Sequence, residues 1–261
     1  SSLYFAKRGM KKRSLLMLGL SALLRIYPIV LVIPFALILE SDFKKRARLV
    51  FVGILPLLVS MAIGWAQGQI GVIRGIAPMG HLAYPLAMKF FLGLNDRLYV
   101  FVLIYSLILL FLYIEPQVGF KNLVQYSFYV LALFFATSFF HPHYLIWIVP
   151  FMAFYFDIPK FQSVYRLLLV GWVIYTFQWG RDLAGSLLAP LSPAFFWSTL
   201  SPSELINHYY PSVQIIGMGR SFFSATCLAL VYLVWKKHKE TEKPKEVAEE
   251  SPGEVVYETT S

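Results

Sequence analysis

Two short polar segments interrupt apolar runs of this chain, and both carry side chains that can take part in chemistry. The first, Arg25-Ile26-Tyr27-Pro28, lies between the apolar runs 14–24 and 29–39. An ionisable group at membrane depth costs about 2.5 kcal/mol or more on insertion scales, so it is a functional candidate by default. The guanidinium of Arg25 donates two parallel hydrogen bonds, which suits a phosphate or pyrophosphate. The alternative is an arginine that only anchors the segment to lipid headgroups.

The second segment is His141-Pro142-His143-Tyr144, which leads directly into Leu145-Ile146-Trp147. Imidazoles, a phenol and an indole at one turn can hydrogen-bond a sugar or phosphate and stack on a pyranose ring. An interfacial aromatic belt is the alternative, although histidine is not typical of such belts. A His-x-His pattern without a nearby third ligand is a weak metal signal. We therefore expect no cofactor and leave a divalent metal open.

Other polar segments are weaker candidates. Arg181 and Asp182 follow a further apolar run, and they can simply pair with each other. The loop segments 81–85 and 207–211 combine histidine with tyrosine, but loop packing explains them better. No paired carboxylates, nucleophile triad or glycine-rich phosphate loop appears in the sequence. The catalytic residue of any enzyme of this sequence is therefore unknown.

The elements that must position these residues are apolar. Hydrophobic residues make up 58% of the 261 residues and charged residues only 14%, which argues against a soluble domain. Several apolar runs are shorter than the roughly 20 residues of a straight membrane span and are interrupted by proline. Such broken spans are tolerated only where they pack against protein or line a cavity. We predict an all-α, polytopic transmembrane bundle with spans at 14–24, 29–39, 49–66, 98–114, 123–140, 145–156, 164–179 and 221–235.

The distribution of Lys and Arg predicts how the spans are oriented. If 14–25 and 29–39 are two arms of a hairpin, most of the 23 basic residues lie on one side of the membrane. This is the cytoplasmic side, and the opposite, extracytoplasmic side then holds Arg25, His141, His143 and Arg220. We expect the hairpin bend and the His-Pro segment to share one wet vestibule there. The net charge of +9 reflects this bias and anionic lipid, so we expect membrane lipid and no nucleic acid as a partner.

The ends of the chain differ from its middle. Residues 1–235 form the predicted bundle, and the polar segment 236–261 predicts a disordered cytoplasmic tail. Ser1–Phe5, followed at once by a basic cluster, is typical of the inner end of a preceding helix. We therefore interpret the chain as the C-terminal part of a longer membrane protein. A prokaryotic plasma membrane is favoured over the endoplasmic reticulum.

Two segments resemble a known family. Residues 24–34 (LRIYPIVLVIP) resemble the basic-x-Tyr-Pro-Ile segment of GT-C-type glycosyltransferases, especially the GPI-anchor mannosyltransferases. Residues 138–150 (SFFHPHYLIWIVP) resemble the His-Pro segment of archaeal and bacterial members, with His143 where glutamine is more usual. The resemblance implies a hexosyltransferase, mannose being favoured, that takes its sugar from a polyprenyl phosphate on the extracytoplasmic face.

The same resemblance implies roles for individual residues. Arg25 and Tyr27 would bind the donor phosphate, and the sugar or acceptor would contact the remaining candidates, His141, His143, Tyr144, Trp147, Arg181 and Asp182. The family's catalytic acidic residue has no match here, so we expect it upstream of Ser1. Two rival functions stay open: a transporter or lipid flippase, which also uses broken helices, and a non-catalytic membrane subunit.

Overall fold

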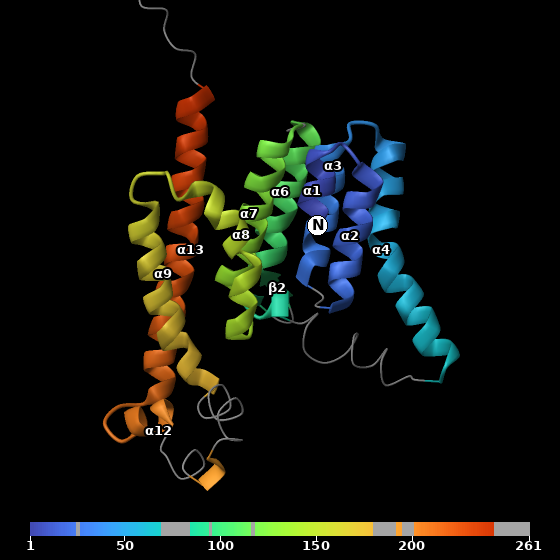
Figure 1. Cartoon of the computed structure of the whole chain (residues 1–261). Helices are drawn as coiled ribbons and strands as arrows, with labels where there is room; N and C mark the ends of the chain where they lie inside the picture. Colours follow the sequence, from blue (N-terminus) through green and yellow to red (C-terminus); the bar gives the residue numbers. More distant parts are fainter. Residues whose placement is uncertain are drawn as a thin grey trace, which may run out of the picture.

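The computed structural model describes residues 1–24, 27–68, 84–93, 96–115, 118–179, 192–194 and 201–242, and these are mainly helical (Figure 1). The longer helices are α2 (Lys11–Leu24), α3 (Val32–Leu39), α4 (Phe43–Ala66), α6 (Val100–Ile114), α7 (Phe120–Thr137), α9 (Phe161–Thr176) and α13 (Ser212–Glu242). The short ones are α1 (Ser2–Lys7), α8 (Val149–Met152) and α12 (Pro202–Asn207), with 3-10 turns at Tyr27–Leu31, Tyr84–Leu86, Pro142–Trp147, Ala153–Tyr155 and Phe177–Trp179.

One small sheet departs from the predicted all-α fold. Strands β1 (Lys89–Gly93) and β2 (Asp96–Tyr99) pair antiparallel just before α6. The sequence alternates too little there to predict a hairpin, so the segment between the predicted spans 49–66 and 98–114 is interpreted as a loop from the sequence alone. Its β1 side chains are all exposed, so the sheet adds nothing to the core.

The predicted hairpin around Pro28 is confirmed. The Nζ atom of Lys11, at the start of α2, lies 3.2 Å from Oε2 of Glu40, just after the end of α3. The two arms are therefore antiparallel. The hydrogen bond from Lys11, helped by backbone N–H groups, lowers the pKa of the Glu40 carboxyl even though partial burial opposes this.

A proline within the second arm explains one long-range contact. Pro34 has no N–H, so it cannot bond the carbonyl four residues earlier, which belongs to Val30. The hydroxyl of Tyr105, on α6, donates to that Val30 oxygen over 2.7 Å. The contact fixes α6 against the bend of the hairpin.

A buried arginine closes the other end of the hairpin. Arg46, in the first turns of α4, is 6% exposed. Its Nε donates to the carbonyl oxygen of Glu40 over 2.6 Å, and its Nη2 donates to that of Leu37 over 3.3 Å. The last carbonyls of a helix have no partner within the helix, so Arg46 supplies donors to the end of α3. The ring of Tyr113 lies 5.7 Å from its guanidinium.

Glycines let two pairs of helices approach closely. A Cβ on Gly19 of α2 would lie 2.1 Å from the carbonyl oxygen of Gly53 on α4, so only glycine fits. A Cβ on Gly171 of α9 would lie 2.8 Å from the backbone nitrogen of Phe223 on α13, and one on Gly219 would lie 2.4 Å from the side chain of Ile174. Small residues at such crossings are typical of helix packing in membranes.

The molecule therefore contains two closely packed pairs. In Figure 1, α9 and α13 lie side by side on one flank, α2 and α4 lie on the other, and α6, α7 and α8 stand between them. The aromatic core is centred on α7, where Phe128, Phe134 and Phe135 are fully buried.

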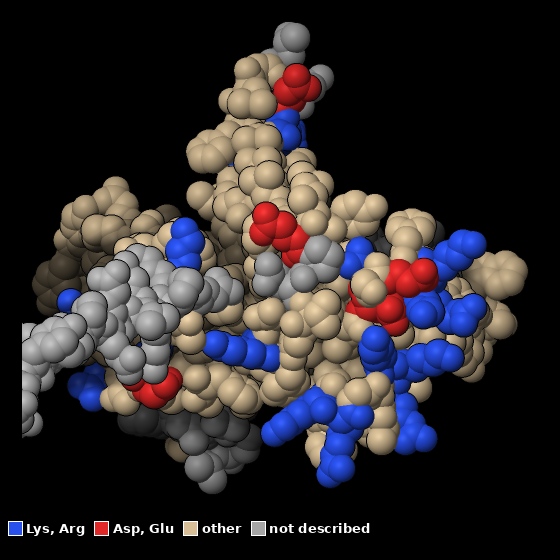
Figure 2. All heavy atoms as spheres, turned by 90° about the horizontal axis from the view of Figure 1, so that it is seen from above, with Lys and Arg blue, Asp and Glu red and all other residues tan. Residues whose placement is uncertain are grey.

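Basic residues gather at one end of the bundle, as the charge pattern predicted. Lys7 lies 6.0 Å from the ring of Phe120, and Arg46 contacts Tyr113, so the ends of α1, α3 and α6 meet the starts of α4 and α7. Figure 2, which looks onto this end, shows Lys and Arg spread over the face with fewer Asp and Glu among them.

Three predicted boundaries need correction. The last helix begins at Ser212 and not near Ser221, so Arg220 lies inside α13 and not in a loop. The same helix continues to Glu242, so the first seven residues of the expected disordered tail are helical. The predicted span 145–156 is not one helix: part of a 3-10 turn, the short helix α8 and the turn Ala153–Tyr155 follow one another, and Pro150 lacks the N–H that a continuous helix would use to bond residue 146.

By length and composition, two of the described helices could cross a membrane: Phe43–Ala66 and Ser212–Thr241. The apolar helical stretches Tyr27–Leu39 and Val100–Ile114 are shorter.

Candidate functional site

The two segments singled out in the sequence meet in the fold. The ring of Tyr27, just after the bend of the hairpin, lies 4.7 Å from the ring of Tyr144, centroid to centroid. Phe134 of α7 supports Tyr27 from the side at 5.0 Å. Tyr27 is 3% exposed and Tyr144 is 2% exposed. The two rings therefore join the segments as part of the core, which differs from the wet vestibule that we expected around them.

The imidazoles lie at the accessible edge of this contact. His141 is half-buried and His143 is exposed, and their rings are 5.8 Å apart. His141 packs 5.7 Å from Tyr144 on one side and 5.5 Å from Trp179, at the end of α9, on the other. Two imidazoles beside an indole can donate or accept hydrogen bonds while the indole face stacks on an apolar ring.

The backbone is extended at Ser138, just after α7, and at His141, whereas His143 lies in the 3-10 turn Pro142–Trp147. Ser138 has φ −104° and ψ 153°, and His141 has φ −77° and ψ 144°. We call residues 138–144 the His-Pro turn.

The carbonyls of Ser138, Phe140 and Pro142 in this segment are bound by two later helices, α9 and α13. Trp172 Nε1 donates to the Pro142 oxygen over 3.2 Å, and Tyr175 Oη donates to the Phe140 oxygen over 3.2 Å. Arg220 Nη2 donates to the Ser138 oxygen over 2.7 Å. Non-helical backbone away from water needs such partners. The positions of His141 and His143 are thus set by α9 and α13.

Below the tyrosine contact is a cavity of about 380 Å³, which we call the elbow cavity. Tyr27 and Trp147 both line it, and Trp147 is half-buried. The other walls are mainly apolar and come from α1, α2, the turn Tyr27–Leu31, α3, α7 and α8, and they include Met17, Leu31 and Leu131. Two of the predicted site residues therefore face one apolar space.

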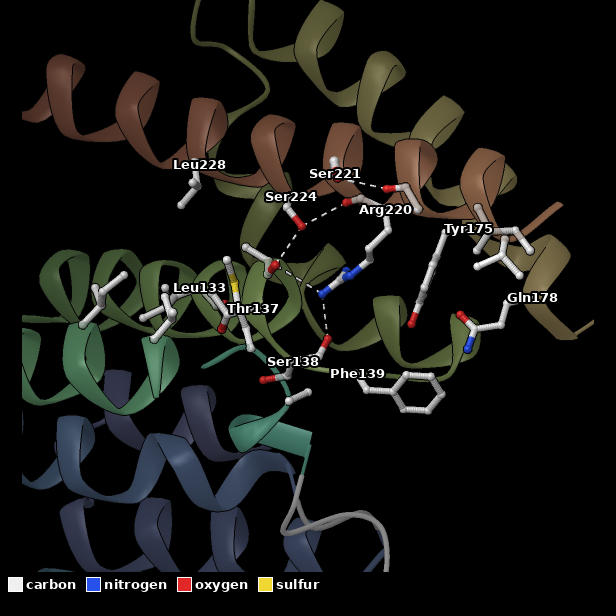
Figure 3. A pocket seen from close by; sticks show the side chains of 18 residues that line it. Leu133, Thr137, Ser138, Phe139, Tyr175, Gln178, Arg220, Ser221, Ser224 and Leu228 are labelled. Carbon is white, nitrogen blue, oxygen red and sulfur yellow. Dashed lines mark hydrogen bonds between the residues drawn. The ribbon is translucent and has the colours of Figure 1, made fainter. Parts of the chain in front are cut away.

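A larger cavity of about 820 Å³ lies between α6, α7, α9 and α13, and we call it the Arg220 cavity (Figure 3). Arg220 extends from α13 toward the end of α7, where its Nη2 bonds two carbonyls. Its guanidinium carbon lies 5.1 Å from the ring centres of both Phe140 and Tyr175. The elbow cavity and the Arg220 cavity share no lining residue.

The remaining predicted residues divide into two groups. Arg25, Arg181 and Asp182 lie outside the described residues, so their roles stay predictions. Of the others, the structure brings together Tyr27, His141, His143, Tyr144 and Trp147. Across the described ranges, no three His, Cys, Asp or Glu side chains are grouped as metal ligands would be.

Sequence reasoning passed over Arg220, which it placed in an outer loop without a role. The sequence does indicate a helix at Arg220, because the stretch before it, Val213–Gly219, is largely apolar and contains no proline. An arginine with apolar residues on both sides indicates a position within a helix and not at its end. Its partners, which lie more than 80 positions earlier in the chain, could not be read from the sequence.

Comparison with known proteins adds no relative: no family model matches the chain, and no curated protein or solved structure does so either. The family resemblance of residues 24–34 and 138–150 therefore stays an expectation drawn from those residues, and function has to be argued from the geometry.

Proposed function

We propose that this chain belongs to a membrane glycosyltransferase, which moves a hexose such as mannose from a polyprenyl-phosphate donor to an acceptor hydroxyl on the extracytoplasmic face. One observation carries the proposal. The two segments that resemble GT-C enzymes, far apart in sequence, contact each other through Tyr27 and Tyr144. A chance resemblance in two unrelated loops gives no reason for them to meet.

The surface of the bundle supports a multi-pass membrane setting. On α6 the exposed side chains Leu103, Leu107, Leu110 and Ile114 repeat at helical spacing and are 43% to 65% exposed. On α9, Leu167, Val170 and Val173 form a second such stripe. Continuous apolar stripes of this kind are unusual on a soluble protein and suit contact with lipid. The basic end shown in Figure 2 would then face the cytoplasm.

The parts of the site fit the parts of such a donor. Arg25, two residues before Tyr27, would bind the donor phosphate and stabilise the negative charge that grows on it as the sugar departs. The elbow cavity, with its apolar walls, would take the first units of the isoprenoid chain. His141 and His143 would hydrogen-bond the sugar or the acceptor. None of the described residues is proposed as the catalytic base.

The test is transfer of radiolabelled sugar from polyprenyl-phosphate hexoses, measured in membranes from cells that express the complete protein. Arg25→Ala should lower the transfer rate at least about 100-fold, the order expected when one group that stabilises transition-state charge is lost. His143→Gln should retain most activity, because an amide also donates and accepts hydrogen bonds. Arg97→Ala, in the hairpin before α6, is the matched control at the same end of the bundle.

Two results would contradict the proposal. One is the absence of transfer from every polyprenyl-phosphate hexose tried, with the protein correctly inserted. The other is equal transfer by Arg25→Ala and Arg97→Ala. Movement of the lipid across the membrane without sugar transfer would favour the flippase.

A further inference from the structure

The structural role of Arg220 uses one nitrogen of its guanidinium. Its Nη2 donates to the carbonyl oxygens of Ala136 and Ser138, at the end of α7. Ser224, one turn along α13, also donates to the Ala136 oxygen over 2.7 Å. These bonds satisfy carbonyls that a helix end leaves without partners, and a cation there suits the helix dipole.

One nitrogen of the Arg220 guanidinium, Nη1, is buried and has no partner among the described residues. The hydroxyl oxygen of Ser138 is also buried without a hydrogen bond to them, and the whole of Ser138 is 1% exposed. Both residues line the Arg220 cavity. A buried donor without an acceptor costs about 1–3 kcal/mol, and more when it is charged. Two such groups at one cavity indicate a ligand that accepts hydrogen bonds.

Arg46 provides a comparison within the same molecule. It likewise donates to the final carbonyls of a helix and contacts a tyrosine ring. No nitrogen of Arg46 is among the buried atoms without a partner in the described residues, and Arg46 lines none of the described cavities. Capping a helix therefore does not by itself leave a guanidinium nitrogen that is both buried and without a partner.

The cavity itself restricts the ligand. Arg220 is the one charged side chain among the described residues that line it, and Ile104, Leu133, Ile216 and Leu228 supply apolar walls. None of the described residues that line it is acidic. We propose that the Arg220 cavity binds the phosphate monoester headgroup of a membrane lipid, with Arg220 Nη1 and the Ser138 hydroxyl donating to phosphate oxygens and the acyl chains lying along the apolar walls.

Phosphate fits these donors better than a neutral headgroup would. A guanidinium already bound to carbonyls and ringed by Phe140, Tyr175 and Phe223 still carries its full charge, and an anion neutralises it. The exposed amide of Gln178 stands at the same cavity and gives the headgroup a further polar neighbour. This site does not depend on the proposed glycosyltransferase activity, because the elbow cavity is separate.

The test is binding of radiolabelled dioctanoyl phosphatidic acid to the complete protein in nanodiscs of neutral lipid. Ser138→Ala should weaken binding about tenfold, the loss expected for one hydrogen bond to a charged group. Ser221→Ala is the matched control, since Ser221 lines the same cavity but its hydroxyl donates to Gly217 within its own helix. Arg220→Lys, which keeps the charge and loses the fork, should weaken binding more than tenfold.

Competition experiments separate the sources of phosphate. Inorganic phosphate that competes with the same dependence on Ser138 would support an anion site open to free phosphate, and failure to compete would support a lipid headgroup. Dioctanoylglycerol, which lacks phosphate, should not compete. Equal binding by Ser138→Ala and Ser221→Ala, both with unchanged thermal stability, would overturn the proposal. So would equal competition by dioctanoylglycerol.

Discussion

Five arginine or aromatic side chains that the structure describes use a polar group to bind a backbone carbonyl of another segment. They are Arg46, Tyr105, Trp172, Tyr175 and Arg220. Each of the carbonyls lies at a helix end or within four residues of a proline, where regular helical hydrogen bonds are missing. Where water is scarce, a carbonyl without a partner is costly, so these residues stabilise the breaks that give the bundle its cavities.

Tyr105→Phe tests this at one position. Removing the hydroxyl leaves the Val30 oxygen, which Pro34 cannot bond, without a donor. We expect the free energy of unfolding to fall by about 1–2 kcal/mol, measured by denaturant titration of the protein in detergent. The control is Tyr113→Phe in the same helix, where the side chain is exposed. Equal loss in the two variants would contradict the role given to the Tyr105 hydroxyl.

For single residues, the sequence predicted the candidates for the site better than it predicted what their side chains contact. Tyr27 and Tyr144 stood out by their place beside prolines, yet their burial against each other was not foreseen. A tyrosine at an interface has the same sequence pattern whether its ring faces lipid, water or another ring. Arg220 shows the same limit, because its partners come from α7.

At the scale of elements, the close pairing of α9 with α13 depends on two glycines. Gly171 and Gly219 lie where any side chain would meet the partner helix. The pair carries Trp172, Tyr175 and Arg220, so the spacing of these two helices sets the position of the His-Pro turn. The sequence predicted the hairpin of α2 and α3 from charge alone, but it placed the start of α13 too late by reading Arg220 as part of a loop.

Gly219→Ala tests the pairing. A Cβ there would lie 2.4 Å from Ile174 Cγ2, so we expect a loss of about 1–3 kcal/mol in the free energy of unfolding, the usual cost of overpacking. Gly217→Ala is the control, because its Cβ would meet nothing within 4 Å. That variant should be as stable as the wild type or more so, since alanine favours a helix. Equal stability of the two variants would contradict the close contact.

At the scale of the whole molecule, charge separates the two ends. The basic end holds the connections from α1 to α2, from α3 to α4 and from α6 to α7. The other end holds the β-hairpin, the His-Pro turn and α12 (Figure 1). The alternation of basic and non-basic connectors in the sequence predicted this division, because the connectors on the cytoplasmic side of a membrane protein carry an excess of Lys and Arg. Neither cavity could be predicted, since each depends on how separate helices pack.

Single cysteines test the division. Lys45 and Lys89 are both exposed and lie at opposite ends, and the one native cysteine, Cys227, is buried. A membrane-impermeant maleimide added to intact cells should label a cysteine at position 89 and not one at 45, and inverted vesicles should give the reverse. Labelling of both from the same side would show that the two ends do not face opposite compartments.

The bonding of residues 136–142 also implies a sequence of events during biosynthesis. The carbonyls of this stretch are bound by donors that leave the ribosome later, Trp172 and Tyr175 first and Arg220 last. A nascent chain that stops short of residue 220 holds the oxygens of Ala136 and Ser138 without the guanidinium that the finished protein gives them. We therefore expect the His-Pro turn to reach its final conformation only after α13 has been synthesised.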